Sequence, residues 1–336
     1  MLEPTSPYAP AENRYEAMDY RRCGASGLIL PAVSLGFWHN FGDLTPFEDM
    51  RRLVCAAFDN GVTHFDLANN YGPEPGRAET NCGLLLATDL KAHRDELVVS
   101  TKAGYEMWPG PYGDGGGRKY LIASLDRSLE RLGLDYVDVF YHHRPDPSTP
   151  LEETMGALAH VVAQGKALYV GLSNYDGPAM ERASAILDEL HVPFVISQNR
   201  YNIFDRTIER NGLKETAARL GKGIIAFSPL AQGLLTDRYL HGVPSDSRIA
   251  RDPRFLNGSA LTPQRLAQIR ELNDVAAARG QTLAEMSLAW LLHDGVVTSV
   301  LAGASRPGQL LDNIGALANT TFGDEELARI DEISQR

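Results

Sequence analysis

Four polar side chains in the first half of the sequence follow short apolar runs and together have the chemistry of a proton-donor site. Asp66 ends one such run and Tyr71 follows it, Lys102 follows the next run, and His143 follows a third. If each run is a strand of a parallel sheet, all four residues leave the sheet at the same edge. They can therefore meet in space although they are scattered along the chain.

The reaction that these residue types favour is the reduction of a carbonyl. A phenol such as that of Tyr71 has an ordinary pKa of about 10, too high to share its proton readily at neutral pH. The ammonium of Lys102 is expected to stabilise the phenolate and lower that pKa, and Asp66 to keep the ammonium charged. His143 could hydrogen-bond the substrate oxygen. Hydride must come from a cofactor, because no side chain can supply it.

A second histidine, His142, directly precedes His143 and raises the question of a metal pair. No third ligand lies at a recognisable spacing, so no metal is expected. Adjacent side chains of a strand face opposite ways, so only one of the two histidines can enter the site.

The elements that must position these residues are eight short apolar runs separated by amphipathic stretches. Two of those stretches, 120–132 and 151–162, have apolar residues at helical spacing. Eight strand–helix units predict an α/β protein with a single closed (β/α)₈ barrel, the TIM barrel. An open doubly wound sheet is the alternative, but no G-x-G-x-x-G follows the first strand. The predicted strands are 32–35, 63–66, 97–100, 136–141, 167–170, 194–197, 223–227 and 298–301.

Two segments depart from this alternation. Residues 20–22 and 27–29 flank a turn and predict a hairpin that plugs the bottom of the barrel. Residues 228–263 form a long insertion after the seventh strand, where a barrel enzyme carries its binding loops. We therefore expect an N-terminal extension over 1–17 and one barrel domain over 18–336.

Net charge, apolar stretches and cysteine count limit the kinds of molecule that this protein is expected to bind. The net charge of −11 disfavours nucleic acid and anionic membranes, both of which need a basic face. No apolar stretch is long enough to span a bilayer, and no signal peptide is recognisable. The three cysteines match no metal or redox spacing and are expected to be reduced thiols. A cytoplasmic enzyme acting on a small molecule is expected.

The motifs around the four polar residues resemble those of the aldo-keto reductases, from about Tyr20 to the end of the chain. The bacterial branch of glyceraldehyde 3-phosphate and methylglyoxal reductases is the most similar, through HNFG at 39–42 and MWPGPYG at 107–113, and that branch is related to potassium-channel β subunits. The family motifs present are FDLANNYG at 65–72, STK at 100–102, YVD at 136–138, HRPD at 143–146, GLSN at 171–174, FSPLAQG at 227–233 and GASR at 303–306.

This resemblance implies a catalytic tetrad of Asp66, Tyr71, Lys102 and His143, in which Tyr71 donates the proton. The motif register selects His143 over His142. The channel-associated branch has asparagine at the position of His143, so the histidine favours an enzyme.

The resemblance also implies NADP(H) as the cofactor, bound without a Rossmann motif. Ser173, Asn174 and Gln198 would bind the nicotinamide amide, and Phe227 would stack on the ring. Phe227 stands where the family often has Trp or Tyr, which puts cofactor affinity in question. Three arginines, Arg238, Arg248 and Arg306, could neutralise a 2′-phosphate. The remaining implied cofactor contacts are Trp38, Ser228, Pro229, Leu230 and Gln232 near the nicotinamide and pyrophosphate, and Gly303, Ser305, Gln309, Asp312 and Asn313 around the adenosine half.

The implied substrate pocket is lined by Trp38, Tyr71, Trp108 and His143, and nearby Arg144 suits a short polar or anionic carbonyl. Relatives in this branch form tetramers and octamers, so a homo-oligomer is expected. Two other functions stay open. One is a cofactor-sensing accessory subunit like the channel-associated relatives. The other is a Schiff-base aldolase using Lys102, which would leave the predicted adenosine site unexplained.

Overall fold

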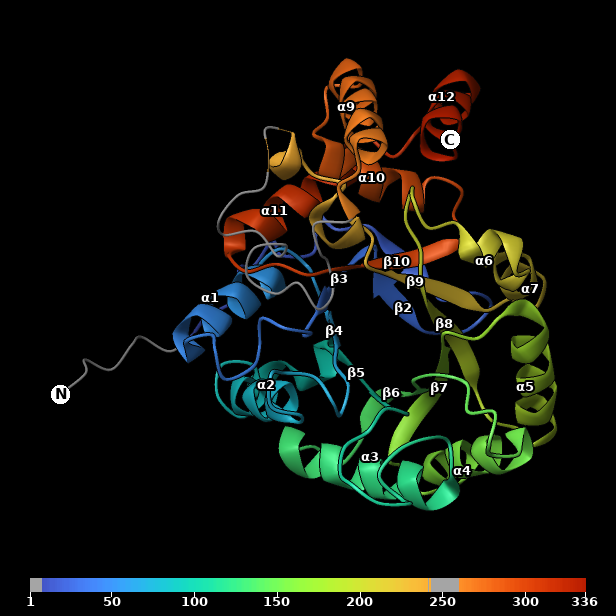
Figure 1. Ribbon diagram of the computed structural model, residues 1–336. Coiled ribbons are helices and arrows are strands. Elements are labelled where there is room, and N and C mark those ends of the chain that lie inside the picture. The colour runs from blue at the N-terminus through green and yellow to red at the C-terminus, as the bar shows by residue number, and fades with distance from the viewer. Residues whose placement is uncertain (1–7, 241, 243–259) are drawn as a thin grey trace.

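The structure is a computed structural model and describes residues 8–240, 242 and 260–336. Its centre is a closed barrel of eight parallel strands, as predicted, with the ring order β10-β3-β4-β5-β6-β7-β8-β9 (Figure 1). The strands of the barrel are β3 (Val33–Gly36), β4 (His64–Asp66), β5 (Val98–Ala103), β6 (Val137–His142), β7 (Ala167–Ser173), β8 (Phe194–Arg200), β9 (Gly223–Phe227) and β10 (Val297–Ala302).

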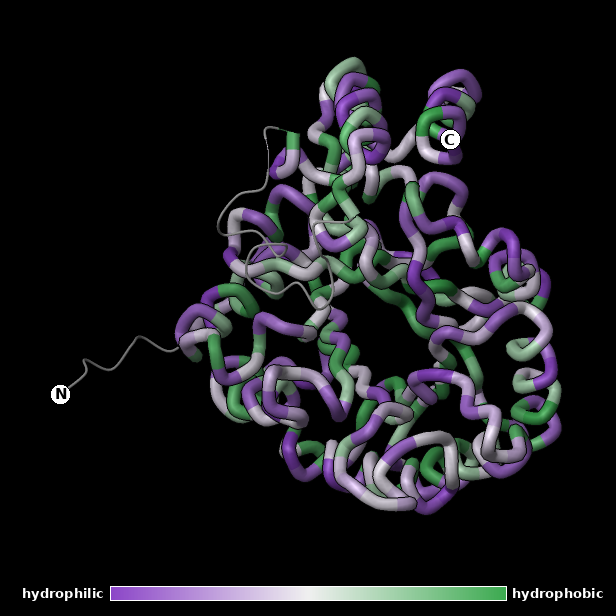
Figure 2. Tube along the Cα trace, viewed as in Figure 1, coloured by the Kyte–Doolittle hydropathy of each residue, from purple (hydrophilic) through white to green (hydrophobic). Residues whose placement is uncertain are grey.

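Helices surround the barrel, and α9 and α12 pack together outside this ring (Figure 1). Figure 2 shows hydrophilic and hydrophobic residues alternating along the surrounding helices, whereas the strands are mostly hydrophobic. The helices are α1 (Phe47–Phe58), α2 (Arg77–Ala87), α3 (Arg118–Leu132), α4 (Leu151–Ala163), α5 (Gly177–Glu189), α6 (Thr207–Arg210), α7 (Leu213–Arg219), α9 (Pro263–Ala278), α10 (Leu283–Leu292), α11 (Pro307–Gly315) and α12 (Asp324–Ser334), with short 3₁₀ helices η1 (Lys91–Glu96), η2 (Ala231–Gly233), η3 (Asp237–Tyr239) and η5 (Ala316–Ala318). Within the described ranges, none of them combines the length and apolarity that a bilayer crossing requires.

Several strands run further toward their carboxyl ends than their apolar runs predicted. Lys102 was expected after a strand but lies inside β5, and Ser173 and Gln198 lie inside β7 and β8. The physical reason is that the interior of the barrel turns polar at this end, so the backbone ladder continues where the apolar side chains stop. These buried polar residues therefore belong to the sheet itself, which fixes their positions more firmly than a loop would.

An antiparallel hairpin of β1 (Tyr20–Arg22) and β2 (Ile29–Pro31) lies against the amino-terminal end of the barrel, as predicted. Its apolar residues Cys23, Leu28 and Leu30 are buried in one cluster with barrel residues such as Val195 and Ile225. The backbone N–H of Ala25 also donates to the carbonyl of Gly221, just before β9, at 2.8 Å. The hairpin therefore closes this end of the barrel.

Part of the predicted N-terminal extension docks on the barrel's outer helices. The hydroxyl of Tyr8 donates to Asp59 at 2.8 Å, and Arg14 pairs with Glu96 at 2.6 Å. Asp59 follows α1 and Glu96 ends η1. The domain boundary at residue 18 stays a prediction.

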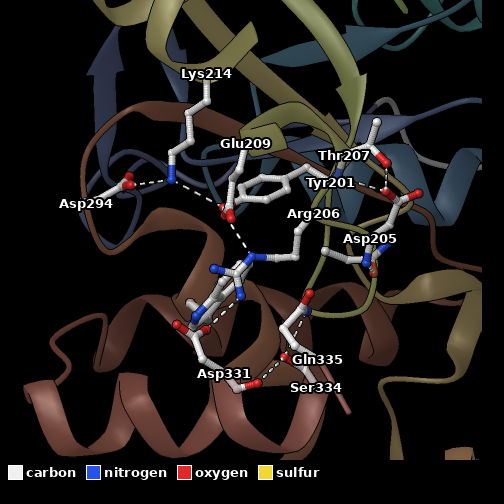
Figure 3. A network of polar contacts seen from close by, with 12 residues as sticks. Tyr201, Asp205, Arg206, Thr207, Glu209, Lys214, Asp294, Asp331, Ser334 and Gln335 are labelled. Carbon is white, nitrogen blue, oxygen red and sulfur yellow. Dashed lines mark hydrogen bonds and ion pairs between the residues drawn. The ribbon is translucent and has the colours of Figure 1, made fainter. Parts of the chain in front are cut away.

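The segment after β8 is held by the polar network of Figure 3. Glu209 accepts hydrogen bonds from the hydroxyl of Tyr201 and, at 2.8 Å, from Nε of Arg206, while Arg206 Nη1 reaches Asp331 of α12 at 2.8 Å. Lys214 pairs with Asp294 at 2.6 Å in the same network. These contacts fix the chain that follows β8 at the carboxyl end of the barrel.

The close approach of the hairpin to β9 generates a stability prediction. Gly24 has φ +56°, and a Cβ added there would lie 2.1 Å from the carbonyl oxygen of Gly221. Gly24→Ala should therefore lower the free energy of unfolding by about 2 kcal/mol or more, from overpacking and left-handed strain, as measured by urea denaturation.

The matched control is Gly27→Ala in the same turn, where an added Cβ meets nothing within 4 Å. Its unfolding midpoint should stay near that of the wild type. Equal losses in the two variants would mean that docking of the hairpin does not depend on this approach.

Candidate active site at the barrel mouth

The structure brings the four predicted residues together at the carboxyl end of the strands. Asp66 ends β4, Lys102 lies in β5, Tyr71 follows β4 and His143 directly follows β6. Lys102 Nζ lies 2.5 Å from Asp66 Oδ2 and 3.3 Å from the Tyr71 oxygen. The rings of Tyr71 and His143 meet edge to face at 5.9 Å between centroids.

Lys102 uses all three of its protons, and this decides the direction of the hydrogen bond to Tyr71. The ammonium donates to Asp66, to the carbonyl of Leu67 at 2.6 Å and to the phenol oxygen. An ammonium has no acceptor, so the Tyr71 oxygen must accept. The phenolic proton is therefore free to point toward a ligand in the mouth.

Asp66 is held as an acceptor by three donors. Its Oδ2 accepts from Lys102, and its Oδ1 accepts from Ser100 Oγ and Gln198 Nε2, both at 2.9 Å. Asp66 and Lys102 are almost completely buried. A buried carboxylate with this many donors, one of them a cation, stays fixed in orientation.

Burial changes the expected proton chemistry of Tyr71. It raises the pKa of the phenol well above its usual 10, with the charge of Asp66 as a second cause. Burial also lowers the pKa of Lys102 from its usual value, although Asp66 opposes that shift. The expectation that the ammonium lowers the pKa of Tyr71 is thus wrong in this state, because desolvation outweighs the ammonium. The phenol holds its proton at neutral pH, as a proton donor must.

His143 is a neutral imidazole at the wall of the site. Burial and the charge of Lys102 lower its pKa well below 6.5. Tyr105 packs edge to face on it at 4.7 Å, and its Nδ1 is buried without a hydrogen-bond partner among the described residues. The neutral ring can form one hydrogen bond with an oxygen in the mouth.

His142 faces away from the mouth, as the alternation of a strand requires. Its Nδ1 shares a hydrogen bond of 2.7 Å with the hydroxyl of Tyr175, and burial lowers its pKa to about 4. Across the described ranges, no three His, Cys, Asp or Glu side chains gather as a metal site would need.

The residues predicted to hold the nicotinamide lie beside the tetrad. Asn174, which has φ 62°, donates from Nδ2 to the carbonyl of His143 at 3.0 Å and to Ser173 Oγ at 3.1 Å. Gln198 has its Nε2 committed to Asp66, which leaves its Oε1 to meet a ligand amide. Phe227, the last residue of β9, is half-buried on the same rim.

The turn after β9, where the pyrophosphate is predicted, has an unusual backbone. Ser228, Ala231 and Gln232 have φ of 51°, 47° and 59°, in the left-handed region that residues other than glycine seldom adopt. The carbonyl of Ser228 accepts from Asn202 Nδ2 at 3.0 Å. Strain of this kind collects at ligand sites. Pro229 and Leu230 lie inside this turn.

The predicted adenosine residues lie at the start of α11, after β10. The backbone N–H of Ser305 donates to Gln309 Oε1 at 3.0 Å, and Arg306 precedes Pro307 at the start of the helix. Asn313 is buried, and its Nδ2 has no hydrogen-bond partner among the described residues. An orphaned buried amide and a helix amino terminus both suit a phosphorylated nucleotide. Gly303 and Asp312 are exposed nearby, Arg238 lies in η3, and Arg248 falls outside the described residues.

Three residues predicted to lie near the substrate make the following contacts in the structure. Trp38 lies on the rim after β3 with its ring on His39, at 4.1 Å between centroids. Trp108 packs on Tyr120 of α3, at 5.4 Å between ring centroids, and its place in the substrate pocket stays a prediction. Arg144 is tied to Asp114 at 2.8 Å, which uses the charge proposed for an anionic substrate.

Sequence reasoning missed two groups of residues. Tyr105 lines the site beside His143 but follows a glycine in a loop with no marked pattern. His64 and Ser100 sit inside strands, where a polar residue in an apolar run is easily taken as an ordinary core residue. Only their spacing to Asp66 and Lys102, two residues on, could have indicated that they face the same interior.

Comparisons with known proteins agree with the carbonyl chemistry of this site. The model of the aldo/keto reductase family matches residues 32–335. Proteins of two Escherichia coli strains, each named L-glyceraldehyde 3-phosphate reductase, are 56% identical over 95% of this chain and 93% of their own length. Probable voltage-gated potassium channel β subunits of Oryza sativa and Arabidopsis thaliana are 36% identical over 89% of the chain and 91% of their own length.

The buried neutral histidines generate a prediction on pH and stability. His142 in the unfolded chain binds a proton below about pH 6.5, but in the fold only below about 4. The free energy of unfolding should therefore fall as the pH drops from about 6.5 to about 4, by about 3 kcal/mol for such a histidine. His142→Asn, which cannot be protonated, should show a shallower fall in urea denaturation between pH 7 and pH 4.5.

His191→Asn is the control, because this imidazole is exposed. It should keep the wild-type slope. If His142→Asn also kept that slope, His142 would be charged in the fold.

Proposed function

Because the chain belongs to the aldo/keto reductase family, we propose that it reduces a small phosphorylated aldehyde to its alcohol with NADPH. Membership of this family makes it an oxidoreductase, and such enzymes use NAD(P)H. The observation that carries the proposal is the Lys102–Tyr71 contact within an intact set of four residues. A relative named L-glyceraldehyde 3-phosphate reductase, at 56% identity, supports the substrate class.

Each side chain has a definite task in this reaction. Tyr71 donates its proton to the carbonyl oxygen, while Lys102, at 3.3 Å, stabilises the phenolate that results. Asp66 keeps the ammonium oriented, and neutral His143 hydrogen-bonds the same oxygen. A bound nicotinamide cofactor supplies the hydride. The raised pKa of Tyr71 is useful here, since an alkoxide forming on the substrate is basic enough to take the proton.

The preference for NADPH rests on cationic residues at the predicted adenosine end. Arg306 directly precedes α11, where backbone N–H groups already favour an anion. With Arg238 and Arg248 it would neutralise a 2′-phosphate, which NADH lacks. Ser305, Gln309 and the orphaned amide of Asn313 would bind the rest of the adenosine half.

The preference for a phosphorylated substrate has a candidate residue in Arg200. This arginine ends β8, is exposed, and lies with its guanidinium 5.9 Å from the ring centre of Phe227. Unlike Arg144, it makes no ion pair with any residue that the structure describes. An uncommitted guanidinium on the rim of the mouth is suited to a phosphate that enters beside the cofactor.

A cofactor-sensing accessory subunit with weak turnover is the second candidate. The 36% identity to proteins named as channel β subunits favours it, but His143 argues for catalysis because the channel-associated branch has asparagine there. A cytoplasmic location and a homo-oligomer of four or eight chains rest on the resemblance to the bacterial branch.

The proposal predicts that turnover depends on the Tyr71 hydroxyl. Tyr71→Phe should lower kcat about a hundredfold or more, because it removes the proton donor and leaves the packing. The assay follows NADPH oxidation by absorbance with L-glyceraldehyde 3-phosphate, glyceraldehyde and methylglyoxal, and is repeated with NADH.

Tyr136→Phe, at the opposite end of β6, is the matched control and should keep wild-type activity. Activity that survives Tyr71→Phe would contradict the assignment of the donor. Tight NADPH binding without turnover on any carbonyl would favour the accessory subunit.

The phosphate preference predicts a selective effect at Arg200. Arg200→Ala should raise KM for L-glyceraldehyde 3-phosphate about tenfold, because a charge-assisted hydrogen bond is lost, and leave KM for glyceraldehyde unchanged. Equal changes for both substrates would mean that Arg200 acts through the cofactor or the fold.

A further inference from the structure

A line of hydrogen bonds crosses the barrel interior and ends on Asp66. Ser299 of β10 lies 2.6 Å from Ser34 of β3, and Ser34 lies 2.9 Å from His64 Nδ1. The line continues from His64 Nε2 to Ser100 Oγ at 3.0 Å, and from Ser100 to Asp66 Oδ1 at 2.9 Å. All five side chains are 1% exposed or less. The reaction described above uses only the last of them.

The chemistry of the acceptor sets the direction of every bond in the line. The Asp66 carboxylate only accepts, so Ser100 donates to it, and the Ser100 oxygen must then accept from His64 Nε2–H. His64 Nδ1 is left as an acceptor for Ser34, so the one hydroxyl proton of Ser299 goes to the Ser34 oxygen at 2.6 Å rather than to the Ala32 carbonyl at 3.3 Å. The line therefore requires one tautomer of His64. Burial lowers its pKa to about 4, which keeps the ring neutral at working pH.

The line does not conduct protons from solvent. Its far end, Ser299, is completely buried, and its other neighbour is the backbone carbonyl of Ala32 at 3.3 Å, which has no proton to give. What the line can do is align dipoles. Each donor points toward the carboxylate, and hydrogen bonds aligned in this way strengthen one another.

We propose that His64 is a positioning residue of the reaction: through Ser100 it holds the Asp66 carboxylate in the orientation that ties Lys102 to Tyr71. This inference rests on the proposed reductase function. His64 touches neither Tyr71 nor any atom that reacts, so its effect passes through Asp66. Gln198, the other donor to Oδ1, is not part of this line of hydrogen bonds. A change at Ser100 therefore removes the contribution of His64 and leaves that of Gln198.

The test compares His64→Leu, His64→Gln, Ser100→Ala and the double variant His64→Leu/Ser100→Ala. Leucine removes the donor, whereas glutamine keeps an amide nitrogen where Nε2 stood. We expect kcat to fall about tenfold or more in His64→Leu and Ser100→Ala, the scale of a hydrogen bond to a charged group, and to recover in part in His64→Gln. NADPH affinity, measured by fluorescence quenching, should be unchanged.

The double variant separates a shared pathway from general damage. If His64 acts through Ser100, the double variant should be no slower than Ser100→Ala, whereas independent effects would multiply. Ser287→Ala is the control, because Ser287 is equally buried but bonds only to Leu283 of its own helix. It should keep wild-type rates. Multiplied losses in the double variant would overturn the proposal.

A spectroscopic arm needs no turnover and so distinguishes failure of this inference from failure of the reductase function. ¹⁵N spectra of the His64 ring should show the neutral Nε2–H tautomer from pH 5 to pH 8. Ser100→Ala should alter the shift of Nε2. The opposite tautomer, or a ring that titrates near pH 6.5, would overturn the inference even if the enzyme is active. Absence of wild-type turnover with the predicted tautomer present would instead contradict the reductase function, and with it the role of His64 in catalysis.

Discussion

The buried ion pair between Lys102 and Asp66 is the interaction on which the site depends. Removing an ammonium from water costs several kcal/mol, and a single carboxylate does not offset this cost unless the remaining protons are also satisfied. Here the Leu67 carbonyl and the Tyr71 oxygen accept hydrogen bonds from the other two ammonium protons. Ser100 and Gln198 donate hydrogen bonds to the carboxylate. The same contacts that make the charge tolerable also leave the phenolic proton pointing outward. The same set of hydrogen bonds therefore both stabilises the barrel interior and prepares Tyr71 to donate its proton.

The barrel interior divides along its axis. Near the hairpin it is filled by apolar residues such as Leu28, Leu30 and Val195. Toward the other end it carries His64 and Asp66 of β4 and Ser100 and Lys102 of β5, which are joined by hydrogen bonds. Parallel strands allow this division, because residues two apart on a strand face the same side at successive levels along the barrel. The register of β4 on β5 thereby sets Ser100 opposite Asp66.

The sequence allowed the barrel and the identity of the reacting residues to be predicted, because both depend on local patterns. Apolar runs mark strands, and Asp66, Tyr71, Lys102 and His143 are unusual enough at strand ends to stand out. The strand ends themselves were misplaced, since Lys102 and Ser173 are polar residues that continue a ladder. The packing of Trp108 on α3, the pairing of Arg144 with Asp114 and the balance of forces on Tyr71 depend on contacts between distant segments. No pattern in the sequence reports such contacts, so these had to be seen in the structure.

The hairpin also has a kinetic meaning. It closes the amino-terminal end of the barrel with Cys23, Leu28 and Leu30, so in the described part of the chain Tyr71 and His143 are approached from the opposite end. Two ligands that share one opening of the barrel cannot enter and leave independently. Whichever lies deeper has to arrive first and depart last, so a single opening imposes a fixed order of binding and release.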